Sequence, residues 1–238
     1  FDSLGIAVNS KMTDAIVSMI YGEVNDLTKL CYKLNVRPDE YAGIKDVLSQ
    51  TSNACSIDGF VVSHNGYVAK SLAKGSVDHL VAGHYTRCCQ HLYGNGGSCA
   101  LHSYKSANST TYAVYKGDKI CAIAWTWIND NGDVCFDNIE INKLFDSSSK
   151  EFTAEMVTIY TMLAKEINKA LNCNVYCGIS HSKTAKHLVG YKSVKAPNLP
   201  SDYVGYTDTK YVDIDTKEEM DACVQIVKKS IIRKMFRF

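Results

Sequence analysis

The sequence predicts a mixed α/β fold, an α+β arrangement in which three antiparallel strands precede a long helix and one further strand. Lys116-Gly117-Asp118 and Asn131-Gly132 each separate two apolar runs, which is typical of hairpin turns. Apolar residues then recur every three or four positions over 149–171, which indicates an amphipathic helix. The order strand, helix, strand favours a right-handed parallel crossover.

The first 75 residues have a different pattern, and we expect a small helical N-terminal extension (1–75) before the main domain (76–238). Apolar residues between Met12 and Leu34 form one helical stripe, and Pro38 opens a second short helix. The remaining elements are expected in this order: a hairpin over 59–68 around His64-Asn65-Gly66, a helix over 77–92, strands over 111–115, 119–128 and 134–141, the helix over 149–171, a strand over 174–179, a helix over 182–189, a strand over 211–214 and a C-terminal helix from about 217.

Two local patterns add detail to these elements. Ser148 and Glu151 have the spacing of a capping box at the start of the long helix. Trp125 and Trp127 alternate with smaller residues, so both tryptophans face the same side of their strand. Core packing is the interpretation we favour for them, ahead of stacking on a nucleic-acid base.

Composition excludes several classes of protein. The 238 residues are 46% hydrophobic, which is enough for a core, and the net charge of +1 provides no global field for nucleic acid or acidic lipid. No apolar run is long enough to span a bilayer, so no membrane association is expected. The start, Phe1-Asp2-Ser3, lacks a signal-peptide pattern, and its missing methionine is expected of a fragment or a processed product. We expect a cytoplasmic protein, in the host cytoplasm if the chain is phage-encoded.

Ten cysteines are many for such a protein, and several lie in apolar patterns where we expect reduced, buried thiols. A cluster of cysteines and histidines over 84–102 raises the question of zinc. Its spacings, Cys88-x2-His91 and Cys99-x2-His102, do not match a common structural site, so no metal is expected. A second hypothesis is a Cys/His hydrolase with Cys99 as nucleophile and His181 or His102 as base.

The order of elements over 77–214 resembles the GNAT superfamily of acyl-CoA-dependent N-acyltransferases. Three strings, Cys88-Cys89-Gln90, Asp137-Asn138-Ile139-Glu140 and the stretch from Tyr203 to Asp208, are similar to those of GNAT-like domains, several of them phage-encoded. In that family the third meander strand and the strand after the long helix splay apart to admit the pantetheine arm of the cofactor. The resemblance implies a GNAT-like mixed sheet, acetyl-CoA as cofactor and an amine, not identified by the sequence, as acyl acceptor.

The resemblance also implies roles for particular residues. Glu140, nearer the splayed end than Asp137, is the candidate base. The family's acid tyrosine aligns with Val189, so Tyr191, two residues further on, is the candidate acid, with core packing as its alternative. The start of the long helix is where the family binds the cofactor pyrophosphate. The implied cofactor-binding residues are Ile141, Asn142, Ser147, Ser148, Ser149 and Lys150.

Departures from the family pattern keep a second function open. The stretch 143–150 contains no glycine, although glycine normally lets the backbone approach the phosphates closely. The same stretch is also typical of an exposed loop that ends in a helix cap. The alternative is a catalytically inactive, GNAT-shaped binding or structural module. Its partner, protein or nucleic acid, would contact the basic C-terminal end, although cations there also complement a helix dipole. That end contains Lys228, Lys229, Arg233, Lys234 and Arg237.

Overall fold

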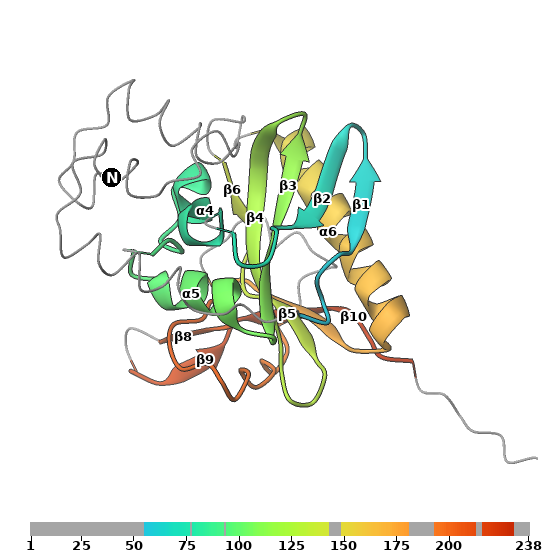
Figure 1. Ribbon diagram of the computed structural model, residues 1–238. Helices are drawn as coiled ribbons and strands as arrows, with labels where there is room; N and C mark the ends of the chain where they lie inside the picture. Colours follow the sequence, from blue (N-terminus) through green and yellow to red (C-terminus); the bar gives the residue numbers. More distant parts are fainter. Residues whose placement is uncertain are drawn as a thin grey trace, which may run out of the picture.

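The computed structural model describes residues 55–76, 78–92, 94–142, 149–180, 193–212 and 216–230. These residues form a mixed sheet with helices on both faces (Figure 1). The helices are α4 (Asp78–Thr86), α5 (Gly97–Lys105) and α6 (Lys150–Leu171). The strands are β1 (Val61–His64), β2 (Tyr67–Ser71), β3 (Ser109–Lys116), β4 (Lys119–Ile128), β5 (Val134–Phe136), β6 (Glu140–Ile141), β7 (Val175–Gly178), β8 (Lys210–Val212), β9 (Glu219–Asp221) and β10 (Cys223–Val227).

The main sheet confirms the predicted topology. Its order is β1-β2-β3-β4-β5-β7-β10, with β6 also paired to β4, and β8 and β9 form a separate ribbon. β3, β4 and β5 are antiparallel neighbours, α6 crosses over, and β7 runs parallel to β5. The antiparallel meander, the crossover helix and the parallel strand are therefore all present.

Turn chemistry explains the predicted hairpins. Asn65 and Gly66 have φ of 48° and 78°, which is the left-handed conformation that a two-residue hairpin turn requires. Gly117 has φ of 62° in the turn between β3 and β4. The first hairpin joins the main sheet because β2 pairs with β3, so this sheet begins inside the range 1–75. The two helices expected before it lie outside the described residues.

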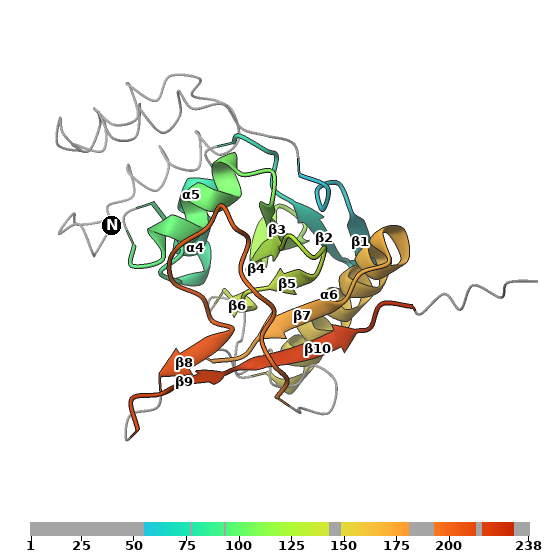
Figure 2. The same ribbon diagram turned by 90° about the horizontal axis from the view of Figure 1, so that it is seen from below.

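Alternation along the strands produces a core on each face of the sheet. Tyr112 and Val114 belong to a cluster with the buried side of α6, whereas Ala113 packs with Leu72 and Ala82 on the opposite face. The buried residues of α6 are Phe152, Met156, Ile159, Tyr160, Leu163, Ala164 and Ile167. Figure 2 shows α6 on one side of the sheet and α4 and α5 on the other.

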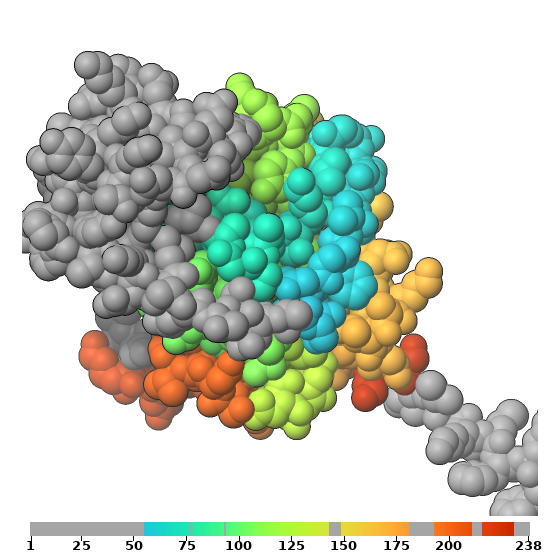
Figure 3. All heavy atoms as spheres, in the orientation of Figure 1, coloured from blue at the N-terminus to red at the C-terminus, as the bar shows by residue number. Residues whose placement is uncertain are grey.

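The two tryptophans lie on the α5 face, as predicted. Trp125 and Trp127 are 1% and 0% exposed and pack with Cys99, Tyr203 and Cys223. The segment 193–209 covers this cluster and continues along the edge of the turn between β4 and β5, where Ser201 donates to Asp130 (3.0 Å). In the space-filling view this orange segment lies against the yellow-green turn (Figure 3).

Several predicted elements were wrong. The expected C-terminal helix from about 217 is instead β9 and β10, because Cys223–Val227 pairs antiparallel with the buried strand β7. The helix expected over 77–92 ends at Thr86, where Arg87 follows with φ of 54°. α5 was missed because its sequence has neither a strong apolar period nor a capping side chain at Gly96. The helix expected over 182–189 lies outside the described residues.

The long helix begins one residue later than its predicted cap. Ser149, not Ser148, is the N-cap, and its hydroxyl oxygen accepts the backbone N–H of Phe152 (3.1 Å). Asn172 ends the helix in the left-handed conformation. The helix bounds 150–171 were therefore predicted correctly, while the capping residue was not.

All nine cysteines in the described residues are free. Cys55, Cys99, Cys121, Cys135, Cys173, Cys177 and Cys223 are buried. Cys88 is half-buried and Cys89 is exposed, so these two adjacent thiols differ from all the others.

Candidate active site

The candidate site lies where β5 and β7 separate. These parallel strands pair at only three positions, the last being Phe136 with Cys177. The chain then leaves β5 and resumes pairing with β4 at Glu140, so the predicted strand 134–141 is split into β5 and β6. Three residues, 137–139, lie opposite two residues of β4, which is the extra residue of a β-bulge. The two strands of the parallel pair therefore diverge at the bulge.

Two buried carboxylates hold this bulge. Asp137 is 0% exposed and Asp208, from the segment after Tyr203, is 2% exposed. The backbone N–H of Asp208 donates to both carboxylate oxygens of Asp137, at 3.0 and 3.1 Å, and Thr207 donates its hydroxyl to the same carboxylate. Gln90 adds a longer contact from its side-chain amide, at 3.4 Å. The segment 207–208 is thereby fixed to the end of β5.

Asp208 connects the bulge to β7. Its carboxylate accepts hydrogen bonds from Asn138 Nδ2 (2.9 Å), Ser180 Oγ (2.9 Å) and Tyr206. Its carbonyl oxygen accepts the backbone N–H of Ser180 (3.3 Å). Asp208 thus spans the gap between the diverging strands, and each of its polar groups has a partner.

Burial and the nearby charge of Asp208 raise the pKa of Asp137 to about 8. A carboxyl group with this pKa keeps its proton in the folded protein at neutral pH, although it would be ionised in the unfolded chain. Near neutral pH the protonated Asp137 therefore adds no negative charge beside Asp208. This arrangement removes the repulsion that two adjacent carboxylates would otherwise have.

This shift predicts a pH dependence of stability. The pKa of Asp137 is raised from 3.8 to about 8 on folding, so the free energy of unfolding should fall as the pH rises between these values. The slope from this residue is at most about 1.4 kcal/mol per pH unit. Asp137→Asn should flatten the profile, and Asp118→Asn in an exposed turn should not. Urea unfolding across the pH range measures this, and an unchanged slope in Asp137→Asn would contradict the assignment.

Glu140 lies at the rim of the same network. It is half-buried and accepts a hydrogen bond from Asn138 Nδ2 at 3.0 Å. Its charge also acts on the thiols of Cys88 and Cys89, which places it near the loop after α4. Of Asp137, Asp208 and Glu140, only Glu140 is not fully enclosed.

The structure separates the other predicted site residues. Asn142 donates its side-chain amide to Ile120 O (2.9 Å) and is buried, so it supports the sheet, while Ile141 is half-buried in β6. Ser149 caps α6 and Lys150 is exposed beside it. Ser147, Ser148 and Tyr191 lie outside the described residues.

A mixed-charge pocket of about 380 Å³ lies on the other side of the α6 start. Lys116 contributes a cation and contacts the ring of Tyr67 at 4.7 Å, whereas Glu151 and Glu155 contribute carboxylates. Its lining residues are Asn65, Tyr67, Lys116, Ser149, Glu151, Phe152 and Glu155. Two carboxylates make this pocket a poor place for a pyrophosphate.

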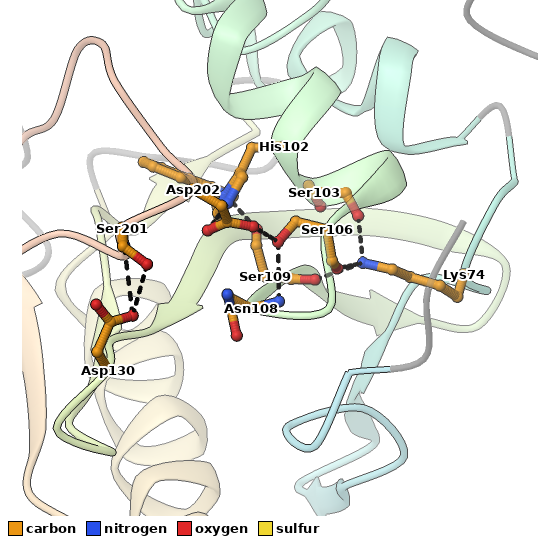
Figure 4. Close-up of polar contacts among 10 residues, drawn as sticks. Lys74, His102, Ser103, Ser106, Asn108, Ser109, Asp130, Ser201 and Asp202 are labelled. Atoms are coloured by element: carbon orange, nitrogen blue, oxygen red, sulfur yellow. Dashed lines mark hydrogen bonds and ion pairs between the residues drawn. The ribbon is translucent and has the colours of Figure 1, made fainter. Parts of the chain in front are cut away.

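The hydrolase hypothesis fails on the geometry of Cys99. This thiol is 0% exposed, contacts Tyr203 OH at 3.2 Å, and has a pKa raised by burial. His102 is held by Asp202, whose other oxygen accepts Ser106 Oγ (Figure 4). These contacts attach the segment 193–209 to α5, and His181 lies outside the described residues.

A neighbouring lysine stabilises the end of α5. Lys74 Nζ donates to the carbonyl oxygens of Ser103, Ser106 and Ser109, at 2.8, 2.6 and 2.5 Å (Figure 4). Carbonyls at a helix C-terminus lack partners within the helix, so the half-buried ammonium group of Lys74 acts there as a structural cap.

The Cys/His segment does not assemble a metal site within the part of the chain that the structure describes, where no group of three or more His, Cys, Asp or Glu side chains is placed to hold one. His84 and His91 instead stack their rings at 4.0 Å. In the same described ranges, no helix is long and apolar enough to cross a membrane.

Sequence reasoning missed Asp208, Gln90 and Cys89 as members of the site. All three lie in strings noted for their resemblance to GNAT-like domains, but nothing in their spacing shows that 89–90 and 206–208 meet the bulge. Asp137 was set aside because Glu140 is nearer the splayed end of the predicted strand. Both residues join one network.

Comparisons with known proteins give one finding about shape. No protein-family model matches the chain, and no curated protein matches it. The chain is similar in structure to the ribosomal-protein-S18-alanine N-acetyltransferase from Escherichia coli, with a TM-score of 0.47 and 12% sequence identity. The match covers 71% of this chain and 99% of that one. A match at this level carries no information on the reaction, which has to come from the residues of this chain.

Proposed function

We propose that this protein is an acyl-CoA-dependent N-acyltransferase that uses acetyl-CoA and acts on a primary amine. The observation that carries this proposal is the parallel pair β5 and β7, which separates at a bulge with Glu140 on its rim. The same connection leads from β6 to the start of α6 within a few residues. A carboxylate thus lies at the point where the sheet opens, and the helix that follows it in the chain begins beside the β1–β2 turn and Lys116.

The residues present fit a thioester donor with a pyrophosphate. The positive end of α6 and the exposed Lys150 favour an anion. The Ser149 hydroxyl donates to Glu151 and, with Glu151 and Glu155, lines the neighbouring pocket, so we assign the pyrophosphate to the backbone N–H groups at the helix start and to Lys150 instead of to that pocket. Acetyl-CoA supplies the activated acyl group, as a thioester.

Glu140 supplies the base in this proposal. An amine is protonated near neutral pH and must lose a proton before its lone pair can attack a carbonyl carbon. The Glu140 carboxylate, held by Asn138, takes that proton, while the buried pair Asp137 and Asp208 fixes the bulge that positions it. The charge of Glu140 near the sheet opening also favours a cationic acceptor.

One observation favours the second candidate, a catalytically inactive binding or structural module. Asp208 and its hydrogen bonds fill the space directly beyond Phe136 and Cys177, so part of the separation between the strands is closed by the protein itself. A macromolecular partner would then contact the basic C-terminal end, of which Lys228 and Lys229 are described and exposed. Cofactor binding separates the two candidates.

We expect acetyl-CoA to bind and to stabilise the fold by about 2.7 kcal/mol at a hundredfold excess over Kd. Lys150→Ala should weaken binding about threefold, because one exposed ionic contact contributes less than about 1 kcal/mol. Lys165→Ala, an exposed lysine further along α6, is the matched control and should bind like the wild type. Calorimetric titration measures both, with acetyl-pantetheine as a ligand that lacks the pyrophosphate. Absence of binding at millimolar acetyl-CoA would favour the inactive module.

A further inference from the structure

The vicinal thiols Cys88 and Cys89 lie beside the proposed site. They form the connection between α4 and α5, and of the cysteines in the described ranges only Cys89 is exposed. The charges of Glu140 and Asp208 act on Cys89, and the charge of Cys89 acts in turn on Tyr206. Cys89 therefore lies within electrostatic range of both carboxylates and of Tyr206.

Backbone geometry places this thiol at the start of α5. Gly96 is the N-cap of that helix and provides no side-chain hydrogen bond. A side chain at Gly96 would meet Cys89 Sγ at 3.1 Å, so the sulfur lies directly against the cap. The backbone N–H of Gly96 also donates to Cys89 O (3.1 Å). The positive end of a helix favours a thiolate over a thiol.

Cys88 provides the second stabilising contact. Its sulfur accepts the backbone N–H of Gln90 (3.3 Å), and its thiol hydrogen-bonds to Cys89. A thiol that accepts one hydrogen bond donates the next more strongly. This contact lowers the pKa of Cys89 to about 7, against the opposing effects of burial, Asp208 and Glu140. Gln90 also reaches Asp137 through its side chain, so one residue links the thiols to the bulge.

We infer that Cys89 is a nucleophile that accepts the acyl group from an acyl thioester before the amine does. This inference rests on the proposed acyl transfer and adds a covalent intermediate to it. The Cys89 thiolate attacks the thioester carbonyl carbon; a new carbon–sulfur bond forms, the old one breaks, and the donor leaves as a thiolate that takes a proton from solvent. The amine then attacks acyl-Cys89, an amide bond forms, Cys89 leaves as a thiolate, and Glu140 takes the amine proton.

The first test measures the thiol without any acyl donor. The full chain is treated with iodoacetamide across the pH range, quenched in acid and mapped by peptide mass spectrometry. Cys89 should react at least about tenfold faster than Cys88 near neutral pH, with a midpoint near pH 7. Cys88→Ala should move that midpoint upward, because alanine removes the hydrogen bond that stabilises the Cys89 thiolate. Equal reactivity of the two cysteines, or an unchanged midpoint, would overturn the inference.

The second test looks for the intermediate. Acetyl-CoA, and separately the small thioester S-acetyl-N-acetylcysteamine, is added without amine. One acetyl group should appear on Cys89 and be removed by hydroxylamine. Cys89→Ser should abolish this adduct and lower turnover about 100-fold or more. Cys88→Ala, which lacks the hydrogen bond to Cys89, should acylate slowly at neutral pH and recover at higher pH, which a merely structural role would not produce.

The outcomes distinguish this inference from the proposed function. If acetyl-CoA binds and Cys89→Ser acylates amines at the wild-type rate, transfer is direct and only the inference fails. If acetyl-CoA does not bind but the small thioester acylates Cys89 selectively, Cys89 is a nucleophile and acetyl-CoA is not its acyl donor. If neither donor acylates Cys89, the inference is overturned.

Discussion

Replacing Gly178 with alanine should lower the free energy of unfolding by about 3 kcal/mol or more. Gly178 ends β7, where a Cβ atom would overlap the carbonyl oxygen of Asp137 and approach the Asp208 backbone at 2.8 Å. These neighbours are backbone atoms fixed by the bulge, so neither side can move without breaking the contact between Asp208 and Asp137. Urea unfolding of the variant measures the loss.

Gly117→Ala is the control for this substitution. Gly117 has open space around its Cα but a φ of 62°, so an added methyl group should cost only about 1 kcal/mol of conformational strain. Equal losses in the two variants would show that the close approach at Gly178 is relieved by a small shift. In that case, the segment 207–208 would not be held against β7 as tightly as the structure indicates.

Replacing Glu140 with glutamine should lower the turnover number for amine acylation by about 100-fold while leaving the affinity for acetyl-CoA unchanged. Glutamine keeps the size of the side chain and an oxygen that can accept the hydrogen bond from Asn138, but it cannot take the proton of the amine. Because the base acts on the acceptor and not on the thioester, formation of acyl-Cys89 should also continue in this variant. Steady-state kinetics with calorimetric titration separates the two effects.

Glu166→Gln is the matched control for Glu140→Gln. Glu166 lies on the exposed side of α6, so its charge should not influence turnover. A rise in the activity of Glu140→Gln with pH would be expected, since more of the amine is then deprotonated in solution. If Glu140→Gln turns over at the wild-type rate, Glu140 is not the base. Tyr206 and the buried carboxylate pair would then be the next residues to test.

Local physical chemistry determined much of the fold from the sequence alone. Residues 150–171 had to bury a stripe of apolar side chains at helical period, and that stripe forms the core with the sheet. Asn65-Gly66 and Gly117 adopt left-handed backbone conformations that few other residues tolerate, so the turns at these points could be predicted from the sequence. Parallel pairing of β7 with β5 followed from the handedness of the crossover.

Part of the candidate site could also be predicted from local sequence. Glu140 follows an apolar strand next to a helix start, and both features lie within a few residues of each other in sequence. Local signals therefore located the candidate base and the positive helix end, although Ser149 replaced Ser148 as the cap. Cys99, in the string Gly97-Ser98-Cys99, was a possible nucleophile, and burial excludes it.

Contacts between distant residues decided the rest, because their energies come from burial and not from local pattern. Cys223–Val227 forms strand β10 because it pairs with the buried strand β7. No strong turn signal in the nearby sequence indicates this pairing. Asp137 and Asp208 are separated by 71 positions in sequence, and only folding brings their carboxylates together and raises the pKa of one. Cys89 differs from the eight other cysteines that the structure describes only through its neighbours: the Cys88 thiol, the cap of α5 and the charges at the bulge. The chain thus determined its strands, turns and long helix, and tertiary packing determined which polar groups share one site.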